Sequence, residues 1–321
     1  MRVSRDQLIA HVERWSADPL HAGSTWVPKY LYHFTDIRNA AAILQAGELL
    51  SRNEAIRRGA MLHDNASSQV IAATALTHRD FARLYFRPRT PTQFHNEGIR
   101  PVVERTFDNA HCPVPVFLVF DLVETLALPG VMFSDGNMAA SHVVFSDAAT
   151  LFAQIPFDLV YHEGPIDLQL RARNVIHHRH AEVLAPRSLR LDTLRWIGCR
   201  SNADRESLLC LLGQTRATWE TRVVVAAGRL FNKRGCCVES AFIDHHGMIQ
   251  FTLHIPNDWR VRVRFELVSE QSGKVWHWTS DAWNGQLLRL TVHGIEPGIM
   301  RLYIEDCLAY VARAQPADVP F

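Results

Sequence analysis

The stretch YLYHFTDIRNAAAILQAGELL, residues 30–50, sets a strand directly before a helix. We expect the strand over residues 26–34 (WVPKYLYHF). Residues 36–46 predict the helix, because their apolar side chains recur on one face. Gly47 then stands where a helix C-cap is expected. This segment is therefore a strand-to-helix junction.

The end of that strand carries His33 and Thr35. Side chains alternate along a strand, so these two lie on the same face. A histidine beside a hydroxyl can hydrogen-bond ribose hydroxyls and an amide. Taken alone, such a pair is more often structural than functional.

Helices and strands also alternate irregularly on either side of the junction. A helix is expected over residues 4–17, where Ser4 and Gln7 form a capping box. The polar stretch from 50 to about 80 predicts short helical pieces at best and reads as a functional loop. The remaining expected elements are strands over 83–87, 114–122, 180–185 and 194–199, a helix over 146–155 with a Ser/Asp cap, and a helix over 203–212 that ends at Gly213.

After about residue 218 the pattern changes to alternating segments separated by turn residues. This spacing is typical of a small antiparallel sandwich or barrel. We therefore expect two domains, residues 1–214 and 215–321. The alternating segments are 221–231, 248–255, 259–268, 274–280, 287–295 and 299–312.

Two features of the C-terminal region have both a structural and a binding interpretation. The tryptophans Trp259, Trp276, Trp278 and Trp283 could stack on bases or sugars, but aromatic side chains also fill small sandwich cores, and the core is favoured. Arg260, Arg262 and Arg264 alternate and so share a face that could meet nucleic acid, although acidic residues elsewhere balance the charge.

The composition is that of a globular protein, with 321 residues, 47% hydrophobic and 21% charged. The net charge of +1 requires any nucleic-acid contact to be a local patch. The chain has 31 Arg and 3 Lys, which reflects genome composition or forked recognition of phosphates. Six scattered cysteines form no CxxC pair, and we expect neither a disulfide framework nor a zinc site. With no signal-peptide or membrane-span pattern, a cytoplasmic location is expected.

Three further motifs follow the first. Residues 84–91 (LYFRPRTP) combine strand aromatics, usually core, with prolines that hold two arginines in an extended segment. Residues 131–141 (VMFSDGNMAAS) contain a turn signal. Residues 179–184 (RHAEVL) place Glu182 on an otherwise apolar strand, which is costly unless the carboxylate is paired or functional. An ion pair with an arginine is the structural alternative.

In this order and spacing, the four motifs resemble the DarT family of bacterial DNA ADP-ribosyltransferase toxins over roughly residues 30–200. The resemblance implies the α+β split-sheet fold of ADP-ribosyltransferases, with the C-terminal β-rich domain as an addition. It implies that Glu182 is the catalytic carboxylate, and that His180 stands where the family usually has Gln. His33 and Thr35 would line the NAD⁺ pocket, with Tyr85 near nicotinamide.

The candidate site residues fall into three groups by expected role. We expect catalytic roles for Glu182, Tyr85 and Arg89, NAD⁺ binding by His33, Phe34, Thr35, Asn53 and Tyr85, and substrate binding by Arg87, Arg179, His180, Ser134 and Asn137. No metal is expected.

One departure concerns an arginine. The family typically carries a catalytic Arg on a helix between the first two motifs, whereas the comparable stretch here, residues 64–70, has none. Arg57, Arg58 and Arg79 are the nearest substitutes. This departure leaves open which base is the target and which type of nucleic acid carries it.

The expected activity is transfer of ADP-ribose from NAD⁺ to a base of single-stranded nucleic acid, with DNA favoured and RNA possible. A toxin or anti-phage role would pair the chain with an antitoxin, such as a macrodomain ADP-ribosylglycohydrolase, and no membrane is expected to take part. The enzymatic alternatives are ADP-ribosylation of RNA or protein and RNA 2′-phosphate transfer. The non-enzymatic alternative is a degenerate fold that binds a nucleotide or a partner.

Overall fold

The computed structural model describes residues 1–18, 23–60, 62, 76–105, 111–244, 247–256 and 259–314. Two compact units divide the chain. Unit 1 contains residues 1–34, 42–94 and 117–197, and unit 2 contains residues 35–41, 95–116 and 198–321. Residues 64–70, compared above with the family's arginine-bearing helix, lie outside the described residues.

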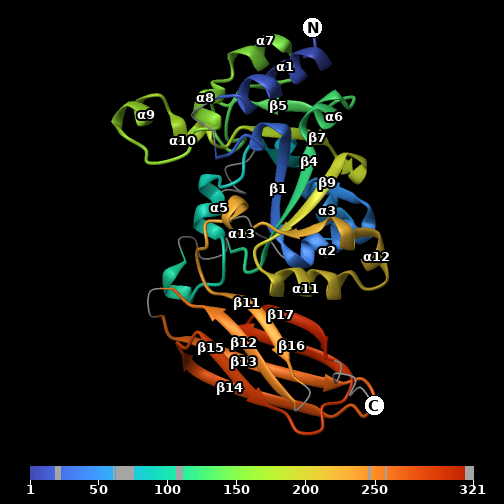
Figure 1. Cartoon of the computed structure of the whole chain (residues 1–321). Coiled ribbons are helices and arrows are strands. Elements are labelled where there is room, and N and C mark those ends of the chain that lie inside the picture. The colour runs from blue at the N-terminus through green and yellow to red at the C-terminus, as the bar shows by residue number, and fades with distance from the viewer. Residues whose placement is uncertain are drawn as a thin grey trace. The chain divides into compact units, whose positions relative to one another are not determined.

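The main sheet has eight strands in the order β10-β9-β4-β1-β3-β7-β5-β6 (Figure 1). Its strands are β1 (Tyr30–Asp36), β3 (Phe81–Tyr85), β4 (Pro115–Asp121), β5 (Met132–Ser134), β6 (Phe145–Ser146), β7 (Glu182–Pro186), β9 (Leu194–Cys199) and β10 (Val223–Val225). A separate antiparallel pair joins β2 (Glu48–Leu50) to β8 (Ser188–Arg190).

Helices, most of them short, lie between the strands along the chain. The α-helices are α1 (Arg5–Ser16), α2 (Ile37–Ala46), α3 (Arg52–Arg57), α5 (Pro91–Asn96), α6 (Leu122–Ala127), α7 (Ala149–Gln154), α8 (Phe157–Val160), α9 (Leu168–Ala172), α10 (Val175–His178), α11 (Asn202–Leu212), α12 (Arg216–Trp219) and α13 (Ala227–Leu230). The 3₁₀ turns are η2 (Val27–Lys29), η3 (Leu76–Asp80), η4 (Val102–Glu104), η5 (Leu191–Thr193), η6 (Gly213–Thr215) and η7 (Glu220–Arg222).

Local signals in the sequence explain the ends of several helices. The capping box at α1 is confirmed, since the Ser4 hydroxyl accepts from the Gln7 N–H and the Gln7 side chain accepts from the Ser4 N–H. Gly47 follows α2 with a φ of 75°, a left-handed conformation that glycine adopts without steric cost. Gly213, with a φ of 53°, ends α11 as expected.

The register of β3 decides where the polar motifs meet. Tyr85 pairs with Tyr32 of β1 on one side and with Glu182 of β7 on the other, both antiparallel. Directly paired residues of an antiparallel sheet have close side chains on one face. The pairing therefore brings the second and fourth motifs together at the end of β3.

Unit 2 contains two antiparallel sheets, with strand orders β11-β12-β15 and β14-β13-β16-β17. Their inward side chains are buried in one core that includes Phe251, Phe265 and Tyr310. This core confirms the predicted β-rich C-terminal region (Figure 1). The strands are β11 (Cys237–Ile243), β12 (Met248–His254), β13 (Val261–Ser269), β14 (Val275–Trp283), β15 (Leu287–Thr291), β16 (Gly298–Ile304) and β17 (Cys307–Ala314).

The structure favours the structural interpretation for the four tryptophans and for two of the three arginines. All four tryptophans singled out above pack, half-buried, against the core of unit 2. Arg262 lies 3.1 Å from a carboxylate oxygen of Asp306, and Arg264 lies 2.9 Å from one of Glu266. Local acidic partners therefore balance the charge of these arginines.

Some expected element boundaries were wrong. Residues 146–155 have no Ser/Asp helix cap, because the Ser146 hydroxyl accepts from the Ala148 N–H before the helix begins, and the Ala149 N–H donates to the carbonyl of Met1. Residues 299–312 are two strands, since Glu305 and Asp306 both have positive φ and form a two-residue hairpin turn.

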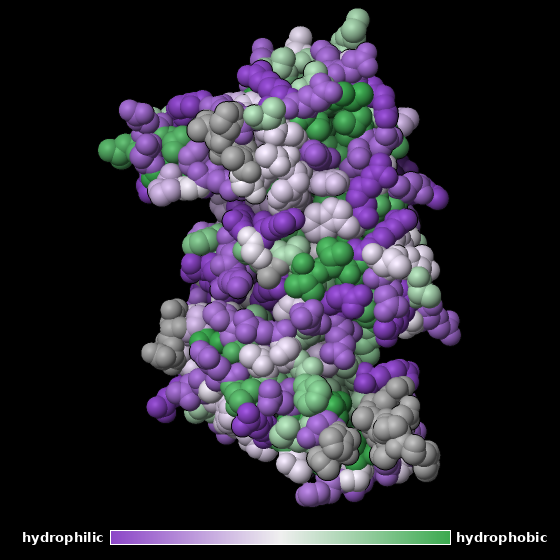
Figure 2. Space-filling view, in the orientation of Figure 1, coloured by the Kyte–Doolittle hydropathy of each residue, from purple (hydrophilic) through white to green (hydrophobic). Residues whose placement is uncertain are grey.

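Two more predicted segments differ from the structure. Residues 221–231 form only the short strand β10 and then helix α13, and residues 26–34 begin with the 3₁₀ turn η2 before β1. Strand β11 was not predicted at all. On the face drawn in Figure 2, the described residues form small hydrophobic groups separated by hydrophilic ones. No helix of the described residues is long and apolar enough to cross a membrane.

Candidate active site

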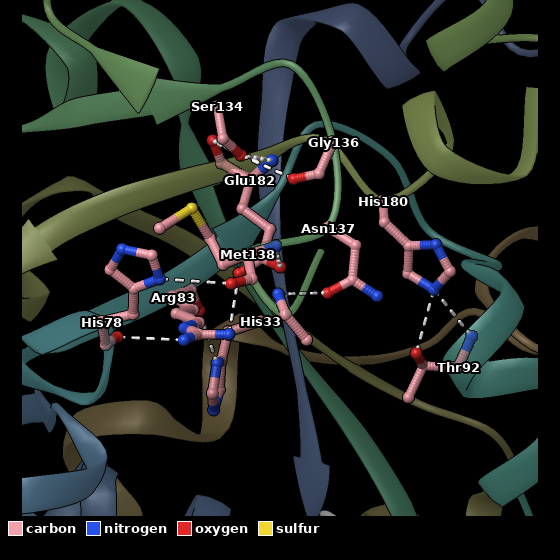
Figure 3. Close-up of polar contacts among 11 residues, drawn as sticks. His33, His78, Arg83, Thr92, Ser134, Gly136, Asn137, Met138, His180 and Glu182 are labelled. Atoms are coloured by element: carbon pink, nitrogen blue, oxygen red, sulfur yellow. Dashed lines mark hydrogen bonds and ion pairs between the residues drawn. The ribbon is translucent and has the colours of Figure 1, made fainter. Parts of the chain in front are cut away.

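A buried carboxylate stands at the centre of the predicted site. Glu182 is the first residue of β7 and has a relative exposure of 1%. Its Oε1 accepts a hydrogen bond from the Met138 N–H at 3.2 Å, and its Oε2 lies 3.4 Å from a guanidinium nitrogen of Arg83. Among the described residues, Oε2 has no hydrogen-bond partner. Figure 3 shows these groups converging on the carboxylate.

Burial and nearby positive groups act in opposite directions on this carboxyl group. Burial raises the pKa of Glu182, while the charge of Arg83, the Met138 N–H and the nearby His78 lower it, and burial is the largest of these effects. Tyr85, paired across the sheet, has a pKa raised by its own burial and by the Glu182 charge. The tyrosine is therefore a neutral hydroxyl at physiological pH.

His33 reaches the same strand from β1. Its Nδ1 lies 3.0 Å from the carbonyl oxygen of Arg83. Burial lowers the pKa of His33 to about 4, so the ring is neutral near pH 7. A carbonyl oxygen can only accept, so Nδ1 carries the proton and Nε2 is the acceptor. Arg83 thus contacts the first motif through its backbone and the fourth through its side chain.

The other residues assigned to the NAD⁺ pocket have local contacts. The hydroxyl of Thr35 is buried and accepts from the Asn39 amide at 3.3 Å. The ring of Phe34 packs against Phe117 with centroids 5.5 Å apart. The Asn53 amide, on α3, donates to Asp80 at 2.8 Å and joins that helix to η3.

The turn after β3 is held from within. The guanidinium of Arg87 is buried and donates to the carbonyl oxygens of Pro88, Val160 and His162. Arg89 has a φ of 55°, and its backbone N–H donates to the Gln93 side chain at 2.7 Å. These hydrogen bonds fix the Arg-Pro-Arg segment in place, but it is not extended as predicted, because the positive φ of Arg89 turns the backbone.

The Asp-Gly-Asn motif is a turn, and it is tied to β7. The Ser134 hydroxyl accepts from the Glu182 N–H at 3.1 Å and donates to the Gly136 carbonyl at 2.8 Å. The Asn137 side chain accepts from the Ala139 N–H at 2.9 Å. These bonds place the next residue, Met138, where its N–H meets the Glu182 carboxylate.

The two basic residues before Glu182 point elsewhere. His180 accepts from the Thr92 N–H at 3.3 Å through Nε2 and contacts the carbonyl oxygen of Ile176 at 2.9 Å through Nδ1. Figure 3 shows its ring directed toward Thr92 and apart from the group around Glu182. Arg179 contacts His162 at 2.6 Å and the Gly164 carbonyl at 3.1 Å. These two side chains brace the segment that leads into β7.

The sequence did not identify three groups that surround the carboxylate. Arg83, His78 and the Met138 N–H all face Glu182. Alternation along β3 could have placed Arg83 on the face of Tyr85, but the partner strand and its register are not readable from one strand. Among the described residues, no group of His, Cys, Asp and Glu could hold a metal ion.

Comparisons with known proteins point to one family. The family model described as "ssDNA thymidine ADP-ribosyltransferase, DarT" matches residues 32–231. Among solved structures, Thermus sp. 2.9 DarT in complex with ADP-ribosylated ssDNA is 20% identical with a TM-score of 0.50, and the match covers 63% of this chain and 95% of that chain. Thermosipho africanus DarTG in complex with ADP-ribose is 16% identical with a TM-score of 0.47, covering 68% and 53%. No curated protein matches.

The α+β sheet and the matched family model place the chain among the NAD⁺-using ADP-ribosyltransferases. Within that class it belongs to the DarT family, with residues 32–231 as the matched region. The resemblance inferred from the four motifs is confirmed. Strands β11–β17 form the added antiparallel region that follows.

Proposed function

We propose that this chain transfers ADP-ribose from NAD⁺ to a base of single-stranded DNA, with Glu182 as the catalytic carboxylate. One observation carries the proposal: Oε2 of the buried Glu182, which is paired with Tyr85, accepts no hydrogen bond from the part of the chain that the structure describes. Membership of the DarT family supports it, as does the ADP-ribosylated ssDNA bound to the Thermus protein.

The described residues have groups suited to NAD⁺. Ribose hydroxyls are donors, and both Oε2 of Glu182 and Nε2 of His33 can accept. Tyr85 offers an aromatic ring and a neutral hydroxyl beside Glu182. We propose that these three residues, with Phe34, Thr35 and Asn53, bind NAD⁺.

NAD⁺ supplies the ADP-ribosyl group, and nicotinamide is the leaving group. Its bond to ribose breaks with the electron pair on nicotinamide, and a nitrogen of the acceptor base forms the new bond. Glu182 holds the ribose 2′-hydroxyl and places its negative charge beside the positive charge that develops on the sugar. Glu182 also takes the proton that the acceptor nitrogen loses.

The closed surroundings of Glu182 have a consequence for access. With the Met138 N–H on Oε1 and Arg83 beside Oε2, a ribose hydroxyl reaches the carboxylate only if one of these neighbours shifts. The acceptor base must also leave any duplex, because its reactive edge is covered by pairing, and this favours single-stranded DNA.

The remaining candidate residues divide by their burial. We propose that Arg89, Arg179 and Asn137, which are partly exposed, meet the nucleic acid or the pyrophosphate. We propose that Arg87, His180 and Ser134 act through the segments that they hold, because they are buried. A toxin role is part of the proposal, with an antitoxin that removes the modification.

Labelled NAD⁺ tests the proposal directly. The purified chain is incubated with NAD⁺ labelled on the ADP-ribose and, separately, with single-stranded DNA, RNA or protein. Label on DNA, lost in Glu182→Gln, is expected. Label confined to RNA or protein would replace the substrate, and neither label nor nicotinamide release would leave a non-enzymatic binding protein.

A further inference from the structure

Arg83 joins three elements of unit 1 at the candidate carboxylate. One guanidinium nitrogen, Nη1, lies 3.4 Å from Oε2 of Glu182, while the other, Nη2, donates to the carbonyl oxygen of His78 at 2.9 Å. The carbonyl of Arg83 itself faces the ring of His33 at 3.0 Å. The guanidinium of Arg83 is thus held by η3, its backbone carbonyl is held by β1, and its Nη1 faces Glu182 on β7.

The charge of Arg83 balances a cost that the fold imposes on Glu182. The carboxylate side chain has a relative exposure of 2%, against 25% for Arg83. The described groups facing the carboxylate from other elements are Arg83 on β3, Tyr85 on β3, His78 in η3 and the Met138 N–H. Among these, Arg83 is the one with a permanent positive charge, since Tyr85 is neutral and Met138 contributes a dipole.

Two of the three arginines nearest to the family's missing position, Arg57 and Arg58, do not have this place. Arg57 pairs with Glu54. Arg58 pairs with Glu54 and, at 2.5 Å, with Glu48. These contacts hold both guanidinium groups on acidic partners other than Glu182.

We propose that Arg83 is the positioning residue that keeps the Glu182 carboxylate ionised and directed for the reaction, an inference that rests on the proposed function. Its fixed contact with the His78 carbonyl aims the guanidinium at Oε2 and leaves Oε1 to the Met138 N–H. An ionised carboxylate is the form that can hold a ribose hydroxyl as acceptor and take a proton.

The first test needs no NAD⁺. The full chain is labelled with ¹³C at the glutamate carboxyl carbons, and the Glu182 resonance is assigned by its loss in Glu182→Gln. We expect Arg83→Gln to raise the midpoint of this titration by about one to two pH units, because a nearby opposite charge has an effect of that size. Arg83→Lys keeps the charge, so its midpoint should lie close to that of the unmodified chain.

The matched control is Arg190→Gln, which removes an arginine with 81% side-chain exposure and should leave the titration unmoved. Thermal melts of all variants check that they fold. An unshifted Glu182 midpoint in folded Arg83→Gln would overturn the proposal. So would a failure of Arg83→Lys to restore the midpoint, because a charge at that position would then not be the cause.

The second test uses the reaction. The acid limb of kcat/KM for NAD⁺ against pH should move upward in Arg83→Gln by the shift seen in the titration, with activity recovering at high pH. An equal loss at every pH with the limb unmoved would instead indicate a contact to substrate or a structural role. If the unmodified chain shows no activity, the proposed function fails, and the carboxyl titration still decides whether Arg83 controls Glu182.

Discussion

Two arginine–carboxylate pairs with buried carboxylates, one in each unit, show how differently the same chemistry can be used. In unit 1, Arg83 and Glu182 lie on neighbouring strands, 3.4 Å apart, and the arginine keeps 25% exposure. In unit 2, Arg200 and Asp204 are four residues apart in the sequence and lie 3.1 Å from each other, with exposures of 3% and 0%. The second pair is sealed, whereas the first reaches solvent through its arginine.

The difference follows from what surrounds each carboxylate. Asp204 lies in the first turn of α11, and its N–H donates to the Ser201 hydroxyl that caps the helix. Glu182 begins a strand beside a turn whose N–H it accepts. A carboxylate in a helix cap stabilises local structure, while one at a strand end beside a turn can be reached when the turn moves. We therefore expect Asp204 to act on stability, whereas the role proposed for Glu182 is catalytic.

The largest expected effect is on the reaction. Glu182→Gln keeps the size of the side chain but removes its charge and its ability to take a proton. Transfer should fall by about 10²–10⁴-fold, the usual contribution of a general base. Steady-state label transfer to single-stranded DNA measures it, with Glu124→Gln, on an exposed ion pair with Arg5, as the control expected to keep full activity.

The same variant should not lose stability. Burial raises the pKa of Glu182 in the folded chain above its ordinary value of 4.5. The free energy of unfolding therefore falls as pH rises from the ordinary pKa to the raised pKa of the folded chain. Glu182→Gln escapes that loss. Its unfolding free energy should match or exceed that of the unmodified chain at pH 8, and the two should converge below about pH 4, where both side chains are neutral. Full activity combined with a large loss of stability would show that Glu182, like Asp204, has a structural role, and the two pairs would then not differ in function.

The next largest effect is on stability. Asp204→Ala leaves Arg200 buried without its partner, and losing one member of a buried pair costs about 3–5 kcal/mol. Denaturant unfolding measures the loss. Asp192→Ala breaks an ion pair with Arg190 in which the Asp192 side chain is 72% exposed, and it should cost less than about 1 kcal/mol.

A double variant sharpens this prediction. Arg200→Met with Asp204→Leu removes both charges, and such replacements are often neutral or stabilising. It should recover most of the stability lost in Asp204→Ala. A double variant as unstable as the single one would show that packing or the α11 cap, not the unpaired charge, dominates there.

A smaller effect concerns the turn that carries Met138. Ser134→Ala removes the acceptor for the buried Glu182 N–H, which costs about 1–3 kcal/mol when left unsatisfied. We expect kcat to fall along with stability, because the same hydroxyl links the turn to the strand of Glu182. Ser141→Ala, on an exposed residue, is the control. A change in stability with kcat unaltered would separate the turn from the reaction.

How much of this was readable in the sequence depended on the range of the interactions. The β9 strand over residues 194–199 and the end of α11 at Gly213 were predicted from periodicity and capping, which are local. The ordered motifs also led to Glu182 and Tyr85, which the register pairs. The Arg83 contact could not be predicted, because it depends on the pairing of strands about 100 residues apart.

The internal role of Arg87 was hidden for a related reason. Its guanidinium donates to carbonyls of residues 160 and 162, and backbone acceptors leave no mark in sequence. The wrongly predicted helix cap at Ser146 has a local cause. The Ser146 hydroxyl accepts from the N–H of Ala148, two residues further on, and so does not cap the helix that begins at Ala149.

The smallest predicted effect tests whether the first motif belongs to the functional region. His33→Asn can keep a donor for the Arg83 carbonyl but loses the acceptor at Nε2, so NAD⁺ should bind more weakly by about 0.5–1.5 kcal/mol. Calorimetric titration at pH 6 and pH 8 measures the affinity of both proteins. Because the pKa of His33 is about 4, the ring is neutral at both values, and the ratio of the two affinities should not change. A ratio that grows toward pH 6 would mean that a protonated ring binds NAD⁺. If the unmodified chain and His33→Asn bind NAD⁺ with equal affinity at both pH values, the only role of His33 is to hold β3.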